Sequence, residues 1–174
     1  MKNFFPLVAA IFLCAAALAG QASPDKSAGS PLQPLEFLLG DWTSKGGTEL
    51  GESEGLSSFA RELDGRIMVR RSWTRFISGR AAETKHEDLL VIFPQGPGAG
   101  LRAIFFDGEG HVIHYSVTVP SSQTAVFESD PAQPGPRFRL THEVKGESLE
   151  TKFEIALPGQ TEYKTYISGA STKK

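Results

Sequence analysis

The stretch LRAIFFDGEGHVIHYSVTV, residues 101–119, decides the fold. Two runs rich in apolar residues, Leu101–Phe106 and Val112–Val119, flank the tetrapeptide Asp107-Gly108-Glu109-Gly110. In the second run, apolar residues at the odd positions alternate with mostly polar residues, which is the pattern of a half-buried strand. The stretch therefore predicts a β-hairpin.

Similar signals recur at short intervals along the chain. Strands are expected from Asp41-Trp42 onward and over 57–63, 66–76, 87–93, 101–106, 112–119, 124–129, 138–144, 149–156 and 162–168. Asp64-Gly65 is predicted to form a two-residue type I′ turn, since both central positions of that turn need positive φ. The prolines of 130–136 exclude that segment from a strand.

Successive hairpins favour an antiparallel meander. In one domain, such a meander either closes into a barrel or forms a sandwich, and closure removes exposed strand edges. No stretch has a helical period over ten residues. We predict an all-β fold, a β-barrel of about nine to ten strands, with the sandwich as the alternative.

The N-terminus has the pattern of a secretory signal. Lys2 precedes an apolar run of about 15 residues, shorter than the roughly 20 of a membrane-spanning helix, and Ala17-Leu18-Ala19 is a cleavage pattern. We therefore expect a signal peptide over 1–19, removed with Cys14, the only cysteine. The expected protein is exported, periplasmic or extracellular, and has no stable membrane insertion after cleavage. A flexible linker is expected over 20–34, the barrel over 35–170 and a frayed tail over 171–174.

Leu35–Leu39 is too short for an independent helix, and Gly40 ends it, so we expect one helical turn that plugs the barrel. The sequence Leu-Glu-Phe-Leu-Leu-Gly-Asp-Trp, residues 35–42, resembles the opening Phe-Leu-x-Gly-x-Trp of lipocalin-like, or calycin-type, exported bacterial domains. The resemblance extends to about Gly169 and implies a lipocalin-like β-barrel with a short N-terminal plug. Trp42 is then expected in the core of the barrel floor, with ligand contact as the alternative.

The families that the chain resembles include the nitrobindin-like haem-binding barrels. Membership of that group would imply a histidine that binds haem near the C-terminal strand. The matching stretch, Thr161–Gly169, has no histidine, and Tyr163 and Tyr166 are the ring ligands available there. His142 lies on an apolar face earlier in the chain, where we expect a hydrogen-bonded core histidine, with ligand or metal binding as the alternative. Haem binding is therefore a minority hypothesis, and no other cofactor is expected.

Alternation assigns an inner face to several strands. Phe138, Leu140, His142 and Val144 share an apolar face, and the neighbouring strand over 149–156 is also clearly two-sided. The segment 66–76 is ambiguous, because each of its faces carries an arginine. If Ile67 and Trp73 face inward, Arg71 enters the barrel, where a charge needs a partner, a ligand or water. The alternative for the arginines of this segment is pairing with glutamates across the strands.

The first functional hypothesis is a module that binds one small apolar or amphipathic ligand, with an acidic group met by Arg71. Its candidate ligand contacts are Trp42, Arg71, Trp73, Phe105, His142 and Tyr163. A filled interior with Arg71 in solvent would argue against it. The second hypothesis is a structural or interaction protein with a packed barrel and no ligand. The sequence assigns no oligomeric state.

Other activities find little support in the residues. No nucleophile, zinc-protease, phosphate-loop or dinucleotide motif is present, so no catalytic residues and no enzyme are predicted. The net charge is −2 and no basic stripe occurs, so nucleic acid is not an expected partner. His111 and His114 point to opposite faces of a strand, and Glu83, His86, Glu87 and Asp88 are interpreted as a solvated loop leading into a strand. No metal site is predicted.

Overall fold

A computed structural model describes residues 29–48, 51–80, 82–96, 98–132 and 134–174. This part of the chain is all-β, with one short 3₁₀ helix, η1 (Gln33–Leu38), before the first strand. The ten strands are β1 (Gly40–Thr48), β2 (Gly51–Glu62), β3 (Ile67–Phe76), β4 (Lys85–Pro94), β5 (Leu101–Asp107), β6 (Val112–Ser121), β7 (Thr124–Ser129), β8 (Arg137–Lys145), β9 (Ser148–Ala156) and β10 (Lys164–Lys173).

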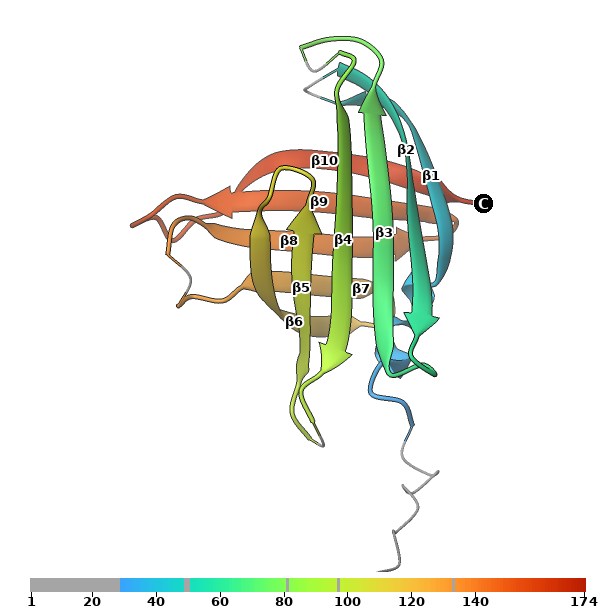
Figure 1. Cartoon of the computed structure of the whole chain (residues 1–174), viewed down its shortest axis with the longest axis vertical. Helices are drawn as coiled ribbons and strands as arrows, with labels where there is room; N and C mark the ends of the chain where they lie inside the picture. The colour runs from blue at the N-terminus through green and yellow to red at the C-terminus, as the bar shows by residue number, and fades with distance from the viewer. Residues whose placement is uncertain (1–28, 49–50, 81, 97, 133) are drawn as a thin grey trace, which may run out of the picture.

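The strands form a closed antiparallel barrel in which each pairs with its neighbours in sequence. β1 closes the barrel against β10, with Trp42 opposite Lys173 and Thr43 opposite Thr172. In Figure 1 the strands β2, β3 and β4 run upright in front, and β8, β9 and β10 cross behind them. The predicted meander and its closure are confirmed.

Both ends of the predicted barrel domain differ from the expected boundaries. Residues 171–173, expected in a frayed tail, belong to β10, and the Lys174 amide donates a hydrogen bond to the Asp41 carbonyl at 2.9 Å. These residues are ordered because they supply the strand that closes the barrel. At the other end Leu32, assigned to the linker, is buried in the core. The signal peptide over 1–19 and the linker up to residue 28 lie outside the described residues.

The turn between β2 and β3 has the predicted positive φ at Asp64 and Gly65 but is longer than two residues. It spans 63–66, with positive φ at Leu63, Asp64 and Gly65, and the Gly65 amide donates to the Glu62 carbonyl. The Arg66 amide also donates to the Leu63 carbonyl at 3.1 Å, which closes a turn with Asp64 and Gly65 at its centre, as predicted. The connection therefore holds two overlapping turns and is longer than the two-residue loop that was expected. The register that results places Glu62 opposite Ile67.

Helix η1 plugs one end of the barrel, as predicted. Leu35 and Leu38 are completely buried, and the Trp42 indole N–H donates to the Leu38 carbonyl at 2.8 Å. Trp42 therefore satisfies its polar atom while its ring fills the floor. Within the described residues, no helix has the length and apolar character needed to cross a membrane.

An antiparallel meander places its connections alternately at two ends. The turns after β2, β4, β6 and β8 lie at the end of η1, and the loops after β3, β5, β7 and β9 lie at the opposite end. We call the first the plug end and the second the mouth. The largest buried apolar side chains, Trp42, Phe59 and Phe127 among them, belong to one core cluster that includes the leucines of η1.

Candidate functional site

The structure determines which face of β3 points inward. Met68 is fully buried and Arg70 nearly so, whereas the Arg71 side chain is 61% exposed and pairs with Glu62 at 2.5 Å. The face of Arg70 therefore lines the interior. The inward position considered for Arg71 is wrong, and cross-strand pairing with a glutamate, the alternative, is confirmed for this arginine.

Two further candidate ligand contacts also lie outside the barrel. Trp73 shares the outer face of Arg71 and borders a surface hollow of about 380 Å³, whose other lining residues are Glu54, Arg75 and Lys85. Tyr163 precedes β10 and lies beneath two guanidinium groups, those of Arg137 at 5.3 Å and Arg139 at 4.2 Å from the ring centre. These arginines alternate with the inward-facing side chains of β8, so Tyr163 packs against the outer wall.

The three remaining candidates lie inside. Trp42 and His142 are buried, and Phe105 is partly buried and packs against the core. The structure therefore places Trp42, Phe105 and His142 on the inner wall and separates them from Arg71, Trp73 and Tyr163.

Three charged or titratable side chains from different strands meet in the interior: Arg70 of β3, Asp88 of β4 and His142 of β8. One Arg70 nitrogen, Nη2, pairs with Asp88 Oδ1, and the side chains are only 6% and 8% exposed. The other, Nη1, lies 3.1 Å from His142 Nε2. A buried guanidinium needs such partners to offset the loss of water. We call these residues the interior charge cluster.

The hydrogen bonds of His142 determine its protonation state. Arginine can only donate, so Nε2 accepts from Arg70, and the ring proton lies on Nδ1, which donates to Thr151 Oγ1 at 3.0 Å. Burial, with the nearby Arg70 charge as the smaller cause, lowers the pKa of His142 well below its usual value. Phe59 and Phe127 present ring contacts to it at 5.5 and 5.8 Å. His142 is therefore a neutral core imidazole.

The ring ligands that the sequence offered for a haem do not fit one in this structure. Both ring nitrogens of His142 are occupied by hydrogen bonds, and the ring is almost fully buried. Tyr163 lies on the outer wall, and Tyr166 is 57% exposed. Tyr115 faces inward, but burial raises the pKa of its phenol, which opposes the tyrosinate form that binds iron. His142 therefore has no free ring nitrogen, and Tyr163 and Tyr166 lie away from the interior.

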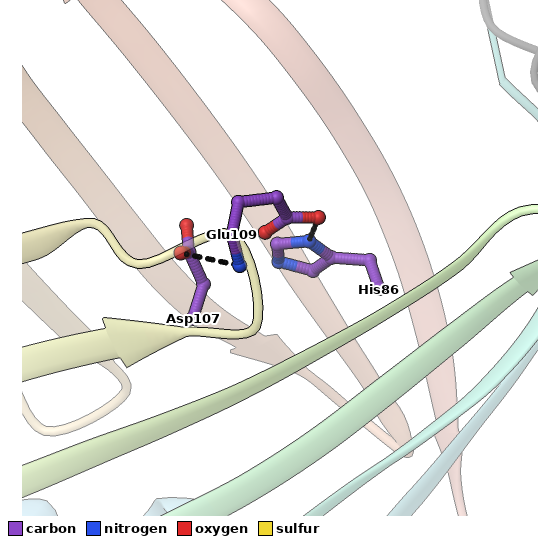
Figure 2. A group of neighbouring side chains, drawn as sticks. All are labelled: His86, Asp107 and Glu109. Atoms are coloured by element: carbon purple, nitrogen blue, oxygen red, sulfur yellow. Dashed lines mark hydrogen bonds and ion pairs between the residues drawn. The ribbon is translucent and has the colours of Figure 1, made fainter.

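A second group of polar side chains lies at the mouth, next to the interior charge cluster. His86, at the start of β4, has Nδ1 3.0 Å from Glu109 Oε1 and Nε2 3.7 Å from Asp88 Oδ2. Asp107, at the end of β5, lies beside them, as Figure 2 shows. We call His86, Asp107 and Glu109 the mouth cluster. The sequence interpreted Glu83, His86, Glu87 and Asp88 as a solvated loop leading into a strand over 87–93. The strand β4 begins earlier and includes His86, and the Asp88 side chain is buried.

The inner wall between the charge cluster and the mouth is open to solvent. Ser57 and Ser72 lie opposite each other on β2 and β3, two residues beyond Phe59 and Arg70, and their hydroxyls are 3.1 Å apart. Both are partly exposed although they share the inward face, as is Thr74 further towards the mouth. At the plug end, by contrast, inward residues such as Met68 have no exposure. The barrel is thus packed in its plug half. In its mouth half, Ser57 and Ser72 remain partly exposed, while Ser53 and Phe76 at the rim are buried.

The fold and this site define the class: a closed ten-stranded antiparallel β-barrel, plugged at one end, with a buried charge cluster beneath an accessible mouth. Comparison with models of known protein families gives no match, and no curated protein is similar to the chain at a significant level.

Proposed function

We propose that this protein is exported and that the mouth half of its lipocalin-like barrel binds one small amphipathic ligand. The observation that carries the proposal is the partial exposure of inward-facing residues such as Ser57, Ser72 and Thr74, because solvent that reaches an inner wall leaves room for a ligand. The signal pattern over residues 1–19 supports export.

The walls of the mouth half favour a ligand with an apolar body and a polar edge. One side, formed by β1 to β3, presents small and hydroxyl-bearing residues: Ser44, Gly55, Ser57, Ser72 and Thr74. The other side presents rings, with Phe138 and Phe153 stacked at 5.7 Å and Phe105 on β5. Apolar walls with a few placed polar groups are typical of small-molecule sites.

Arg70 supplies the group that we assign to ligand recognition in place of Arg71. Its Nε atom is buried and lacks a hydrogen-bond partner among the described residues. A buried donor left unpaired costs about 1–3 kcal/mol. A ligand acceptor that reached Nε, such as a carboxylate or carbonyl oxygen, would remove this cost, so a ligand with an acceptor at its inner end is favoured.

The first test is a native mass spectrum of the protein expressed with its own N-terminus and purified gently. The proposal expects cleavage after residue 19 and an added mass in one-to-one ratio with the chain. If the spectrum shows the protein without an added mass, the protein is then titrated with the fluorescent amphipathic anion anilinonaphthalene sulfonate. If the protein shows no added mass and no saturable binding of this probe, ligand binding is contradicted and a filled barrel is favoured.

Matched variants locate the bound probe. Ser72→Phe places a ring on the inner wall, and Arg71→Phe places the same ring on the adjacent outer position. We expect the first to weaken probe binding at least about 10-fold by filling the mouth half, and the second to leave it within about 2-fold. Equal effects of the two would show that the probe binds elsewhere.

The packed plug half supports the second candidate function, a structural or interaction protein without a ligand. Leu35, Leu38, Met68 and Trp42 leave no exposed inner wall there. The native mass spectrum and the probe titration separate the two functions.

A further inference from the structure

Three metal-binding residues come together at the mouth: Asp107 and Glu109, two residues apart, and His86 from the preceding strand. One ligand atom each from His86, Asp107 and Glu109 lies within 4.8 Å of the others. His86 comes from β4, Asp107 ends β5, and Glu109 belongs to the hairpin that follows, so the pairing of β4 with β5 brings them together. Figure 2 shows the imidazole of His86 directed towards the two carboxylates.

From this mouth cluster we propose a binding site for one divalent transition-metal cation, such as Zn²⁺. One imidazole nitrogen and two carboxylate oxygens are the ligands that such cations take in proteins, whereas Ca²⁺ and Mg²⁺ prefer oxygen alone. The proposal is independent of the small-ligand proposal, since it concerns different side chains and its probe is the metal alone.

The charge balance around His86 favours a cation. Asp107 has a side chain only 7% exposed, and the Glu109 and His111 amides donate to its Oδ1 at 3.1 and 2.8 Å, which stabilises the ionised form. Among the described residues, neither Asp107 nor Glu109 has a lysine or arginine within ion-pair distance; their partners are imidazoles. Hydrogen bonds, including one from His111 Nδ1 to Asp107 Oδ2 at 2.8 Å, thus keep Asp107 ionised, and a metal ion would supply the permanent positive charge that the two carboxylates lack.

The residues behind the cluster have the arrangement of an outer shell. Asp88 is buried, is held by Arg70 through Oδ1, and directs Oδ2 to within 3.7 Å of His86 Nε2. A carboxylate in that position orients a metal-bound imidazole when it accepts the N–H of the second ring nitrogen. His86 Nδ1, now 3.0 Å from Glu109, would then face the metal.

The hairpin gives the cluster room to contract. Metal–ligand distances of about 2.0–2.2 Å require the ligand atoms to approach more closely than their present spacing. Glu109 lies between Gly108 and Gly110, and space around Gly110 is open. The mouth side leaves remaining coordination positions to water.

The test uses the untagged, metal-free protein, titrated with Zn²⁺ by calorimetry, and with Co²⁺ followed by its visible absorption. We expect one ion per chain. Glu109→Gln and His86→Gln should each weaken binding at least about 10-fold, since each removes a ligand. The matched controls, Glu87→Gln on the outward position of β4 and His114→Gln on the outer face of β6, should stay within about 2-fold of the parent.

Absence of stoichiometric Zn²⁺ and Co²⁺ binding by the parent protein would overturn the proposal. The proposal would also be overturned if Glu109→Gln bound the metal as tightly as the parent protein, or if the ligand variants and the control variants lost the same metal affinity. Circular dichroism checks the fold of each variant, and Glu109→Gln keeps the test decisive if His86→Gln fails to fold, because the Glu109 side chain is about half exposed.

Discussion

At the scale of the residue, Arg70 and Arg71 are adjacent in sequence and opposite in environment. Arg70 is enclosed with Asp88 and His142, while Arg71 extends into solvent beside Glu62. Removing one partner of a buried pair leaves an uncompensated charge, whereas an exposed pair contributes little. The two arginines therefore make a matched comparison.

We expect Arg70→Met to lower the free energy of unfolding by about 3–5 kcal/mol, because Asp88 would lose its buried cation. Arg71→Met should change it by less than about 1 kcal/mol. Urea unfolding of both variants measures the difference. Combining Arg70→Met with Asp88→Asn should recover part of the lost stability. Similar losses of stability for Arg70→Met and Arg71→Met would refute the inward position of Arg70.

His142 makes stability depend on pH. Its pKa in the folded protein is lowered, so the unfolded chain, with a histidine pKa near about 6.5, binds the proton more readily. The free energy of unfolding should therefore fall as the pH drops below about 6.5, by up to about 1.4 kcal/mol per pH unit from this group.

Urea unfolding at several pH values between 7.5 and 5.5 tests this dependence. His142→Gln can still accept from Arg70 and donate to Thr151 and has no titration, so its slope should be smaller than that of the parent. His114→Gln, on the outer wall, should keep the parent's slope. An unchanged slope in His142→Gln would contradict a buried, neutral imidazole.

At the scale of the element, the start of β2 depends on a glycine. Gly51 has φ +133°, and a Cβ there would lie 1.9 Å from the Ser78 carbonyl oxygen. Since the Ile77 amide donates a hydrogen bond to the Glu52 carbonyl, the chain after β3 is held against the start of β2. A side chain at Gly51 has no space to occupy.

Gly51→Ala should lower the free energy of unfolding by about 3 kcal/mol, through overlap and backbone strain. Gly47→Ala is the control, because a Cβ at Gly47 meets nothing within 4 Å and alanine suits a strand slightly better. Thermal unfolding of both variants checks the difference. A loss of similar size for Gly47→Ala would assign the effect to strand propensity.

At the scale of the whole molecule, closure depends on the last residues of the chain. Thr172 and Lys173 pair with β1, and the Lys173 and Lys174 amides donate to the Glu147 and Asp41 carbonyls. Without them, one side of β1 becomes a free strand edge, which can pair with another chain.

Deleting residues 171–174 should lower the free energy of unfolding by at least about 3 kcal/mol. The bonds of the Lys173 and Lys174 amides and of the Thr43 hydroxyl contribute about 1 kcal/mol each, and strand pairing with β9 and β1 is lost as well. It should also promote self-association, which size-exclusion chromatography detects. Replacing 171–174 by four other β-forming residues is the control and should restore most of the stability. A deleted chain as stable and monomeric as the parent would contradict this role of β10.

Much of the architecture follows from local patterns in the sequence. Alternation on the strands that carry Tyr115, Leu140 and Leu149 determined their inner faces, because a half-buried strand must separate apolar from polar side chains. The run of hairpin signals determined the meander, and the burial of His142 and the plug at Leu35–Leu38 also followed from local sequence.

Only the tertiary structure decided the face of β3 and the composition of the two polar clusters. On β3 each face carries an arginine, so alternation alone could not choose, and the four-residue turn over 63–66 sets the register that places Arg70 beside inward-facing Phe59. Asp88, His142 and Glu109 are brought to their partners by barrel closure and strand pairing between distant segments. Those pairings depend on register and long-range packing, which short-range periodicity does not encode.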